Sequence, residues 1–301
     1  MEKNQIKATL SIFFIKLSAK LSLPVAQRLG GALGWLVAQL PVEITNVTQK
    51  NIELCFPELP APAQRKLVVE SLMHTGYLMM EIGSAWYKSL EENLGLVAKV
   101  TGQSIMDKAA AKGCGVIVIA PHLGNWEWLN WYTSQRHPGV MVYSPPKHEQ
   151  FDAVLRQSRE IGGGQLAPAN AAGVKMVYKH LKQGGVVYIL PDQVPGKEGG
   201  VVASFFGIPA FSMTLVSRLA RKTGASVVAV YGKRLPAHRG FEVVYIDADE
   251  RIYSKDIQLS VAGLNATVEA CVRDAPEQYQ WSYKRFKRCP QLGLNIYNGH
   301  L

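Results

Sequence analysis

The chain has 301 residues, 48% of them hydrophobic, which is enough to bury one large core or two modest ones. Its 33 Lys and Arg residues outnumber its 23 Asp and Glu residues, and the net charge of +10 indicates an anionic partner such as phospholipid headgroups, an acidic carrier protein or a phosphorylated substrate. The sequence has no RNP signature, no zinc-finger spacing and no long basic run, so nucleic acid is excluded as the expected partner.

Residues 1–41 are apolar, but basic residues interrupt them. Leu10–Ile15 is strongly apolar, and Lys16, Lys20 and Arg28 follow. No run reaches the roughly 20 apolar residues of a clean membrane span, and no small-residue cleavage site indicates a secretory signal peptide. The pattern predicts a membrane-anchoring helical segment, either lying in the interface or forming one marginal span. A buried helix of the soluble domain is the alternative.

From residue 61 to 95 the apolar positions recur at helical spacing, which predicts a packing scaffold. After Gly113 short apolar runs alternate with amphipathic segments. This alternation predicts an α/β fold, with a mixed, mostly parallel sheet flanked by helices in one domain over 42–301. The expected strands are 116–120, 140–143, 186–190, 201–206, 226–231 and 241–246, and the expected helices are 125–135, 149–161, 171–183, 211–223 and 254–274.

The stretch 120–128 places a base and an acid five residues apart, where the strand at 116–120 ends. On a helix, residues i and i+5 are about 140° apart, so His122 and Glu127 cannot share a helix face. The simplest arrangement puts His122 in the loop, Asn125 near the helix N-cap and Glu127 in the first turn, with Gly124 permitting a tight approach. A neutral imidazole held by a carboxylate is a general base. A purely structural helix-start motif is the alternative.

Other chemistries lack their motifs. A helical zinc pair needs an i,i+4 spacing, so no metal site is predicted. The four cysteines are far apart and form no CxxC pair, which favours a reducing, cytosol-facing compartment. The sequence has no GxSxG elbow, no P-loop and no GxGxxG after a strand. Without a preset nucleophile, His122 is expected to deprotonate a hydroxyl group of a bound substrate.

A second polar sequence, with Asp192 and Gln193, follows the strand at 186–190. Ligands of open α/β sheets gather beyond the carboxyl ends of strands, so these residues are expected to share a cleft with His122. Asp192 as an ordinary turn residue is the alternative. Arg156 and Arg159, three residues apart on one helix, are candidates for binding a phosphate or an oxyanion together, and a solvated helix face is the alternative.

The basic cluster 283–288 includes Lys284 and Arg285. It is a candidate for contact with an anionic membrane or a substrate headgroup, and a solvated tail is the alternative.

The block His122-Leu-Gly-Asn-Trp-Glu127 resembles the HX4(D/E) motif of the lysophospholipid acyltransferase superfamily. Its Gly-Asn-Trp-Glu form is similar to the late lipid A acyltransferases, the lauroyl and myristoyl transferases. The hydrophobic, basic N-terminus resembles the membrane anchor of that family. One departure is Ser144, where many relatives carry Arg or another polar residue. Further matches are Tyr143-Ser-Pro-Pro-Lys147, Arg159 before Gly162, Leu181-Lys-Gln-Gly-Gly185, Asp192-Gln193, Phe205-Phe206-Gly207, Thr223-Gly224-Ala225 and Pro276-Glu277-Gln278-Tyr279.

The resemblance implies a glycerolipid-acyltransferase-like fold and a reaction without a cofactor. The enzyme would move a fatty acyl chain from acyl carrier protein, the co-substrate, to a hydroxyl group of a lipid A precursor. The reaction would take place on the cytoplasmic face of the bacterial inner membrane, with anionic lipids as a further partner. The alternatives are a related glycerolipid or glycolipid acyltransferase, with acyl-CoA or acyl carrier protein as donor, and a non-catalytic lipid-binding protein.

Under this resemblance, His122 takes the proton of the acceptor hydroxyl, and Glu127 orients the imidazole and stabilises its positive form. Arg159 is the first candidate for binding the oxyanion, and the backbone amides near Gly124 and Asn125 come next. Asp192 and Gln193 are expected to position the substrate or the His122 loop. The remaining candidates contact substrate or partner: Arg156 at the cleft, and Lys284 and Arg285 at lipid phosphates or the carrier protein.

Overall fold

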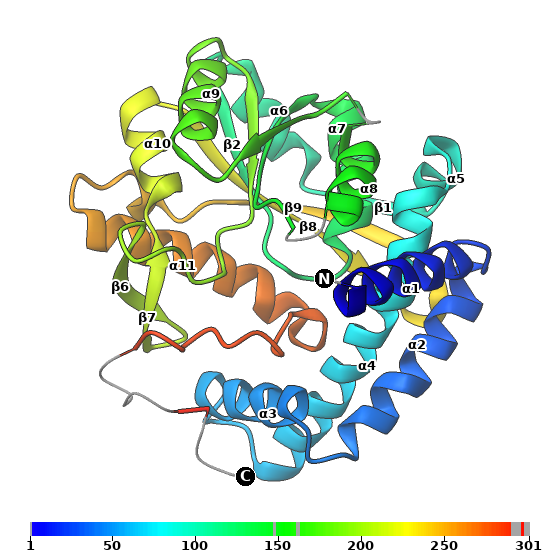
Figure 1. Cartoon of the computed structure of the whole chain (residues 1–301). Helices are drawn as coiled ribbons and strands as arrows, with labels where there is room; N and C mark the ends of the chain where they lie inside the picture. Colours follow the sequence, from blue (N-terminus) through cyan, green and yellow to red (C-terminus); the bar gives the residue numbers. More distant parts are fainter. Residues whose placement is uncertain (1, 147–148, 161–162, 290–295, 298–301) are drawn as a thin grey trace.

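The computed structural model describes residues 2–146, 149–160, 163–289 and 296–297. Its first part is helical (Figure 1). The predicted scaffold at 61–95 is one long helix and one short one, because Ser89 caps a new helix in a capping box with Glu92. The helices of this part are α1 (Glu2–Ser18), α2 (Leu23–Ala38), α3 (Glu43–Cys55), α4 (Ala61–Tyr87) and α5 (Leu90–Leu94).

A seven-stranded sheet forms the centre of the remaining chain, in the order β1-β9-β8-β2-β5-β3-β4. The pairing of β8 with β9 is antiparallel and the other pairings are parallel, so the predicted mixed, mostly parallel sheet is confirmed. Its strands are β1 (Val97–Thr101), β2 (Val116–Ile119), β3 (Gly139–Tyr143), β4 (Gln165–Pro168), β5 (Val186–Ile189), β8 (Ser226–Arg234) and β9 (Phe241–Asp247).

Helices cover both faces of this sheet. Because successive side chains of a strand point to opposite faces, Ile117 and Ile119 of β2 join the core beneath α9, α10 and α11, whereas Val116 and Val118 join the core beneath α6 and α7. A strand buried on both faces has no alternation of polar residues, which explains the continuous apolar run. The helices are α6 (Gln103–Ala111), α7 (Trp126–Arg136), α8 (Glu149–Glu160), α9 (Ala171–Lys182), α10 (Leu215–Thr223), α11 (Ile257–Asp274) and the 3-10 turns η1 (Pro236–His238), η2 (Glu250–Tyr253) and η3 (Pro276–Gln278).

One predicted helix starts too early. Residues 211–213 belong to β7 (Ile208–Met213), which pairs with β6 (Gly200–Phe205) in a separate antiparallel hairpin, and α10 starts only at Leu215. A short apolar run fits a strand and a helix equally well, so periodicity could not separate them. The sequence also missed β1, α6 and β4.

The N-terminal helices pack along α4 at one side of the molecule (Figure 1). The contact between α2 and α4 is backbone to backbone. A Cβ atom on Gly76 would lie 2.0 Å from the carbonyl oxygen of Gly30, and one on Gly34 would lie 2.2 Å from that of Leu72. The outer faces of α1 and α2 expose large apolar side chains, namely Leu10, Phe13, Phe14, Leu17, Leu29, Leu33 and Leu36.

None of the described helices is both long enough and apolar enough to cross a membrane. The predicted association of residues 1–41 with a membrane therefore stays a prediction.

Candidate active site

His122 lies in the loop between β2 and α7, as predicted. Asn125 is the N-cap of α7, where its side-chain oxygen accepts a hydrogen bond of 2.8 Å from the backbone N–H of Trp128. Glu127 is in the first turn. The acid and the base of the motif are therefore on different elements, although they are five residues apart.

Gly124 fixes the path of this loop. Its φ is +62°, and a Cβ atom would lie 1.9 Å from the carbonyl oxygen of Gly232 on β8, so only glycine fits. On the other side, the backbone N–H of Gly124 donates to Gln278 and that of Gln280 donates to His122, both at 3.0 Å. The His122 loop is thus held between β8 and the segment after α11.

Asp192, beyond the end of β5, holds the imidazole. His122 Nδ1 lies 2.8 Å from Asp192 Oδ1, and the backbone N–H of His122 donates to Asp192 Oδ2 at 2.9 Å. Burial by itself raises the pKa of the Asp192 carboxyl, but the His122 charge and hydrogen bonds outweigh burial and lower the pKa below its ordinary value. An ionised carboxylate can only accept, so Nδ1 carries the proton and Nε2 keeps a lone pair.

The sequence predicted that Glu127 orients the imidazole and stabilises its positive form, but the hydrogen bonds of the Glu127 carboxylate come from Arg159 and Trp86, not from His122. Both oxygens of Glu127 accept hydrogen bonds from Arg159 of α8, at 3.3 Å from Nε and 2.5 Å from Nη2. Trp86 Nε1 of α4 donates to the same carboxylate at 3.1 Å. Burial raises the pKa of Glu127, but Arg159, Trp86 and the charge of His122 together lower it below its ordinary value. Glu127 is therefore a nearby fixed anion rather than the partner of His122.

The two predicted arginines do not act together. The Arg159 side chain is only 15% exposed and faces Glu127, whereas Arg156 is 43% exposed and donates to the Tyr143 hydroxyl at 2.7 Å and to Glu160 at 3.2 Å. Three residues along a helix rotate the side chain by about 300°, and here the two guanidinium groups meet different neighbours. A shared bidentate site is excluded, and Arg159 alone remains beside the His122 loop.

The predicted amide donors are already used within the protein. The backbone N–H of Asn125 donates to Gly232 at 3.0 Å, and that of Gly124 donates to Gln278. The Asn125 side chain is buried, and its Nδ2 donates to Glu81 at 2.9 Å. Asn125 therefore shapes the loop, and the prediction that it binds substrate or an oxyanion is wrong.

Glu81 was missed by the sequence analysis, although it supports the His122 loop through the side chain of Asn125. It is buried with Arg234 of β8, whose Nη2 lies 2.7 Å from Glu81 Oε2, and Gln27 of α2 donates to Oε1 at 2.6 Å. The signal was present, because Glu81 lies at helical spacing from the apolar Leu78 and Ala85 and so falls on the buried face of α4.

The two C-terminal candidates differ in exposure. Lys284 is on the surface, with Nζ 2.5 Å from Glu43 Oε1. Arg285 is only 3% exposed, donates to the Phe211 carbonyl and the Ser212 hydroxyl, and lies over the Phe205 ring. A buried guanidinium cannot meet a headgroup, so the prediction for Arg285 is wrong.

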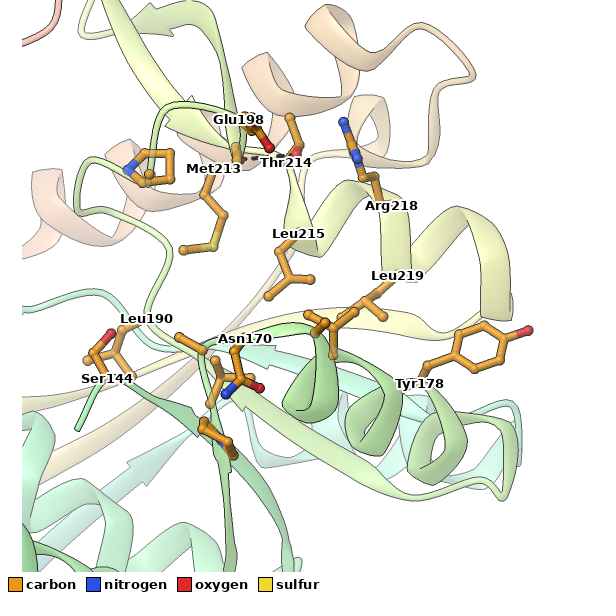
Figure 2. A pocket seen from close by; sticks show the side chains of 18 of the residues that line it. Ser144, Asn170, Tyr178, Leu190, Glu198, Met213, Thr214, Leu215, Arg218 and Leu219 are labelled. Atoms are coloured by element: carbon orange, nitrogen blue, oxygen red, sulfur yellow. Dashed lines mark hydrogen bonds between the residues drawn. The ribbon is translucent and has the colours of Figure 1, made fainter.

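Gln193 connects the imidazole to a large pocket. Its Nε2 lies 3.2 Å from His122 Nε2, and its side chain also lines a cavity of about 1030 Å³. The cavity opens beyond the carboxyl ends of β3, β4 and β5, where ligands of such sheets are expected. Figure 2 shows Ser144 and Leu190 on one side of it and Arg218 on the other.

The walls of the pocket are mainly apolar, and its exposed charged residues carry an excess of positive charge. The apolar lining includes Val142, Leu190, Met213, Leu215 and Leu219, and the exposed charged residues are the cations Lys175, Arg218 and Lys222 and the carboxylate Glu198. The described residues contain no group of three or more His, Cys, Asp or Glu side chains that could hold a metal ion. Lys147 and Gly162, part of the matched blocks, lie outside the described residues.

Comparison with known proteins gives a consistent result. Residues 3–288 match the family model described as bacterial lipid A biosynthesis acyltransferase. The chain is 29% identical over 283 residues to the lipid A biosynthesis lauroyltransferase of Escherichia coli (strain K12), covering 94% of this chain and 92% of that protein. It is 26% identical over 279 residues to the palmitoleoyltransferase of the same organism, covering 92% and 90%, and 27% identical over 244 residues to its myristoyltransferase, covering 79% and 73%.

Proposed function

This chain belongs to the bacterial lipid A biosynthesis acyltransferase family, and from that premise we propose that His122 is its general base. The substrates are an acyl carrier protein that bears a fatty acyl chain and a hydroxyl group of a lipid A precursor. The observation that carries the proposal is the hydrogen bond between His122 Nδ1 and buried Asp192, because it leaves the Nε2 lone pair beside the pocket-lining Gln193.

The reaction needs no acyl-enzyme. His122 Nε2 takes the proton of the acceptor hydroxyl while that oxygen attacks the thioester carbonyl carbon. When the tetrahedral intermediate collapses, the carbon–sulfur bond breaks and the imidazolium returns its proton to the departing thiolate. Asp192 keeps the imidazole in the required tautomer and stabilises its charged form, as a buried carboxylate does in serine hydrolases.

Glu127 and Arg159 contribute charge. The hydrogen bonds to Glu127 use two of the five N–H groups of Arg159, and the others remain available for the developing oxyanion. In this proposal Glu127 holds Arg159 in place and, as a second fixed anion near His122, favours the imidazolium.

The large pocket is proposed to hold the donor acyl chain. Its apolar walls suit a hydrocarbon, and it meets the base at Gln193. Leu215 and Leu219 of α10 lie in its wall, so these side chains would help to set the chain length that is accepted.

Attachment to the cytoplasmic face of the bacterial inner membrane is proposed to occur through the exposed apolar faces of α1 and α2. Phe13 and Phe14 are 59% and 64% exposed, and Leu33 is 55% exposed. Side chains of this size, presented next to lysines, are typical of a helix that lies in the interface plane.

The test is an acyl-transfer assay with purified protein and lipid A precursor. His122→Ala should lower kcat by roughly 10²–10⁴-fold with acyl carrier protein as donor. The matched control is His180→Ala on α9, whose side chain does not line the pocket. A His122→Ala rate near that of the control would overturn the base assignment. A faster reaction with acyl-CoA than with acylated acyl carrier protein would overturn the assignment of acyl carrier protein as the donor.

A further inference from the structure

A second, smaller pocket lies where α1 ends against α4. Its volume is about 450 Å³, and its lining comprises Lys16, Ala19, Lys20, Tyr87, Lys88 and Glu92. Three of these six side chains are cations. The pocket is separate from the large cavity, and the reaction proposed above does not use it.

Two of the lysines are oriented by contacts within the protein. Lys16 Nζ lies 5.7 Å from the centroid of the Tyr87 ring, and Lys88 Nζ donates to the Leu21 carbonyl at 3.2 Å. An ammonium group has three N–H donors, so each keeps donors for a ligand. The three cations face one cavity, a charge concentration that favours an anion.

The single carboxylate of the pocket already has a partner. Glu92 accepts a hydrogen bond of 2.9 Å from the backbone N–H of Ser89 in the capping box of α5. The backbone and side-chain hydrogen bonds with Ser89 lower the pKa of the Glu92 carboxyl, so this group is ionised at neutral pH. With three cations and one anion, the pocket keeps an excess of two positive charges.

The pocket adjoins the apolar surface of α1. Residues three and four apart share a helix face, so Phe13, Lys16 and Leu17 form one stripe that Lys20 continues just past the helix end. Phe13 and Leu17 are 59% and 48% exposed. An apolar stripe that ends in lysines would insert into the acyl region and meet headgroups at the level of the lysines.

Two residues of the pocket follow Trp86 in the chain. Tyr87 is the last residue of α4 and Lys88 is its C-cap, and Trp86 Nε1 donates to Glu127.

We propose that this lysine pocket binds the phosphate group of a membrane lipid. The inference rests on the membrane attachment proposed above and adds a specific headgroup site to it. Both the phosphate of the acceptor lipid and that of bulk anionic phospholipid have the required chemistry, and the experiment distinguishes them.

The experiment measures partitioning of the full chain onto sedimented vesicles. Phosphatidylcholine vesicles are the reference, and the two test vesicles contain in addition either phosphatidylglycerol or phosphorylated lipid A precursor. The variant is Lys16→Gln/Lys20→Gln/Lys88→Gln. The control variant, Lys108→Gln/Lys112→Gln/Lys182→Gln, removes three positive charges outside the pocket. Lys108 is in α6, Lys112 directly follows α6, and Lys182 is the last residue of α9. Thermal unfolding checks that both variants fold.

The wild type should prefer the two test vesicles, whose phosphate groups carry net negative charge, over the zwitterionic reference. The pocket variant should lose roughly 5-fold of that preference per lysine. If the pocket variant loses its preference for phosphatidylglycerol vesicles, the bound phosphate is that of bulk phospholipid. If it loses its preference for precursor vesicles alone, the bound phosphate is that of the acceptor lipid. If pocket and control variants keep equal preference on both, the pocket does not bind phosphate. Failure of the wild type to bind any vesicle would instead overturn the membrane attachment.

Discussion

At the scale of single residues, the partner of the base decides the chemistry. Asp192 is only 4% exposed and contacts both the ring and the backbone of His122. Asp192→Asn keeps the shape of the site but allows the imidazole to place its proton on Nε2, where it cannot act as a base. We expect kcat to fall by about 10³–10⁴-fold with a small change in KM, measured by acyl transfer to lipid A precursor. An unchanged kcat with a raised KM would instead make Asp192 a substrate-binding residue.

The Glu127–Arg159 pair should give a pH-dependent stability. The unfolded-state pKa of Glu is about 4.3, and the folded-state pKa of Glu127 is lower. The stabilisation is therefore fully present above the unfolded value and is lost as the pH falls through the folded value. Glu127→Gln should lower the free energy of unfolding by about 2 kcal/mol at pH 7, and its Tm should approach that of the wild type below about pH 4.

The control for this prediction is Glu58→Gln, which changes an exposed carboxylate. A constant Tm difference between Glu127→Gln and the wild type across the same pH range would contradict the assignment.

The sequence named His122 as the candidate base and expected Asp192 to position substrate or the His122 loop, but it assigned the imidazole to Glu127. His122 was recognisable because the motif lies at a strand end. Asp192 was expected in the same cleft, but a contact between residues 70 apart depends on which strands are neighbours. That order, with β5 beside β2, is a property of the whole sheet and is not contained in the motif. The nearest acid in the sequence was therefore a poor guide to the nearest acid in space.

At the scale of elements, the contact between α2 and α4 has no room for side chains. The Cβ atom of Gly76→Ala would meet the Gly30 carbonyl oxygen at 2.0 Å, so one helix must move. We expect a loss of about 1–3 kcal/mol in the free energy of unfolding, measured by thermal unfolding.

Gly95→Ala, after α5, is the control for Gly76→Ala, because its new Cβ would lie 3.3 Å from the nearest atom. Equal stability of the two variants would show that the helices can separate without cost.

Helices and strands whose apolar residues recur at one clear spacing were predicted well, and those without such a spacing were not. The buried strands β2, β5 and β8 and the helices α7, α9 and α11 were found close to their true bounds. β1 was missed because its sequence, Val97–Thr101, contains Lys99 and is partly exposed at the edge of the sheet. Edge strands bury one face at most, so their apolar signal is weak.

At the scale of the whole molecule, about half of the exposed large apolar side chains of the described residues belong to α1 and α2. Phe13→Ser/Phe14→Ser should reduce partitioning onto phosphatidylcholine vesicles by more than tenfold, since each buried Phe contributes about 2 kcal/mol. Leu259→Ser on α11, where Leu259 is 44% exposed, is the control and should bind like the wild type. Equal loss in both variants would mean that attachment does not depend on α1.

The glycine contact between α2 and α4 also bears on how such a chain can be rearranged. Gln27 of α2 donates to Glu81, and Glu81 in turn accepts from the N-cap residue of α7, so α2 is part of the support of the His122 loop. The boundary expected at residue 41 would cut through this support. A chimera that takes only the first 41 residues from a relative would bring together two helix surfaces that were not shaped for each other. The contact between α1 and α4 is equally close, since a Cβ atom on Gly83 would lie 2.2 Å from the carbonyl oxygen of Ile15. Exchanging 2–87 as one block keeps these surfaces matched, which makes the N-terminal helices together the natural unit of recombination.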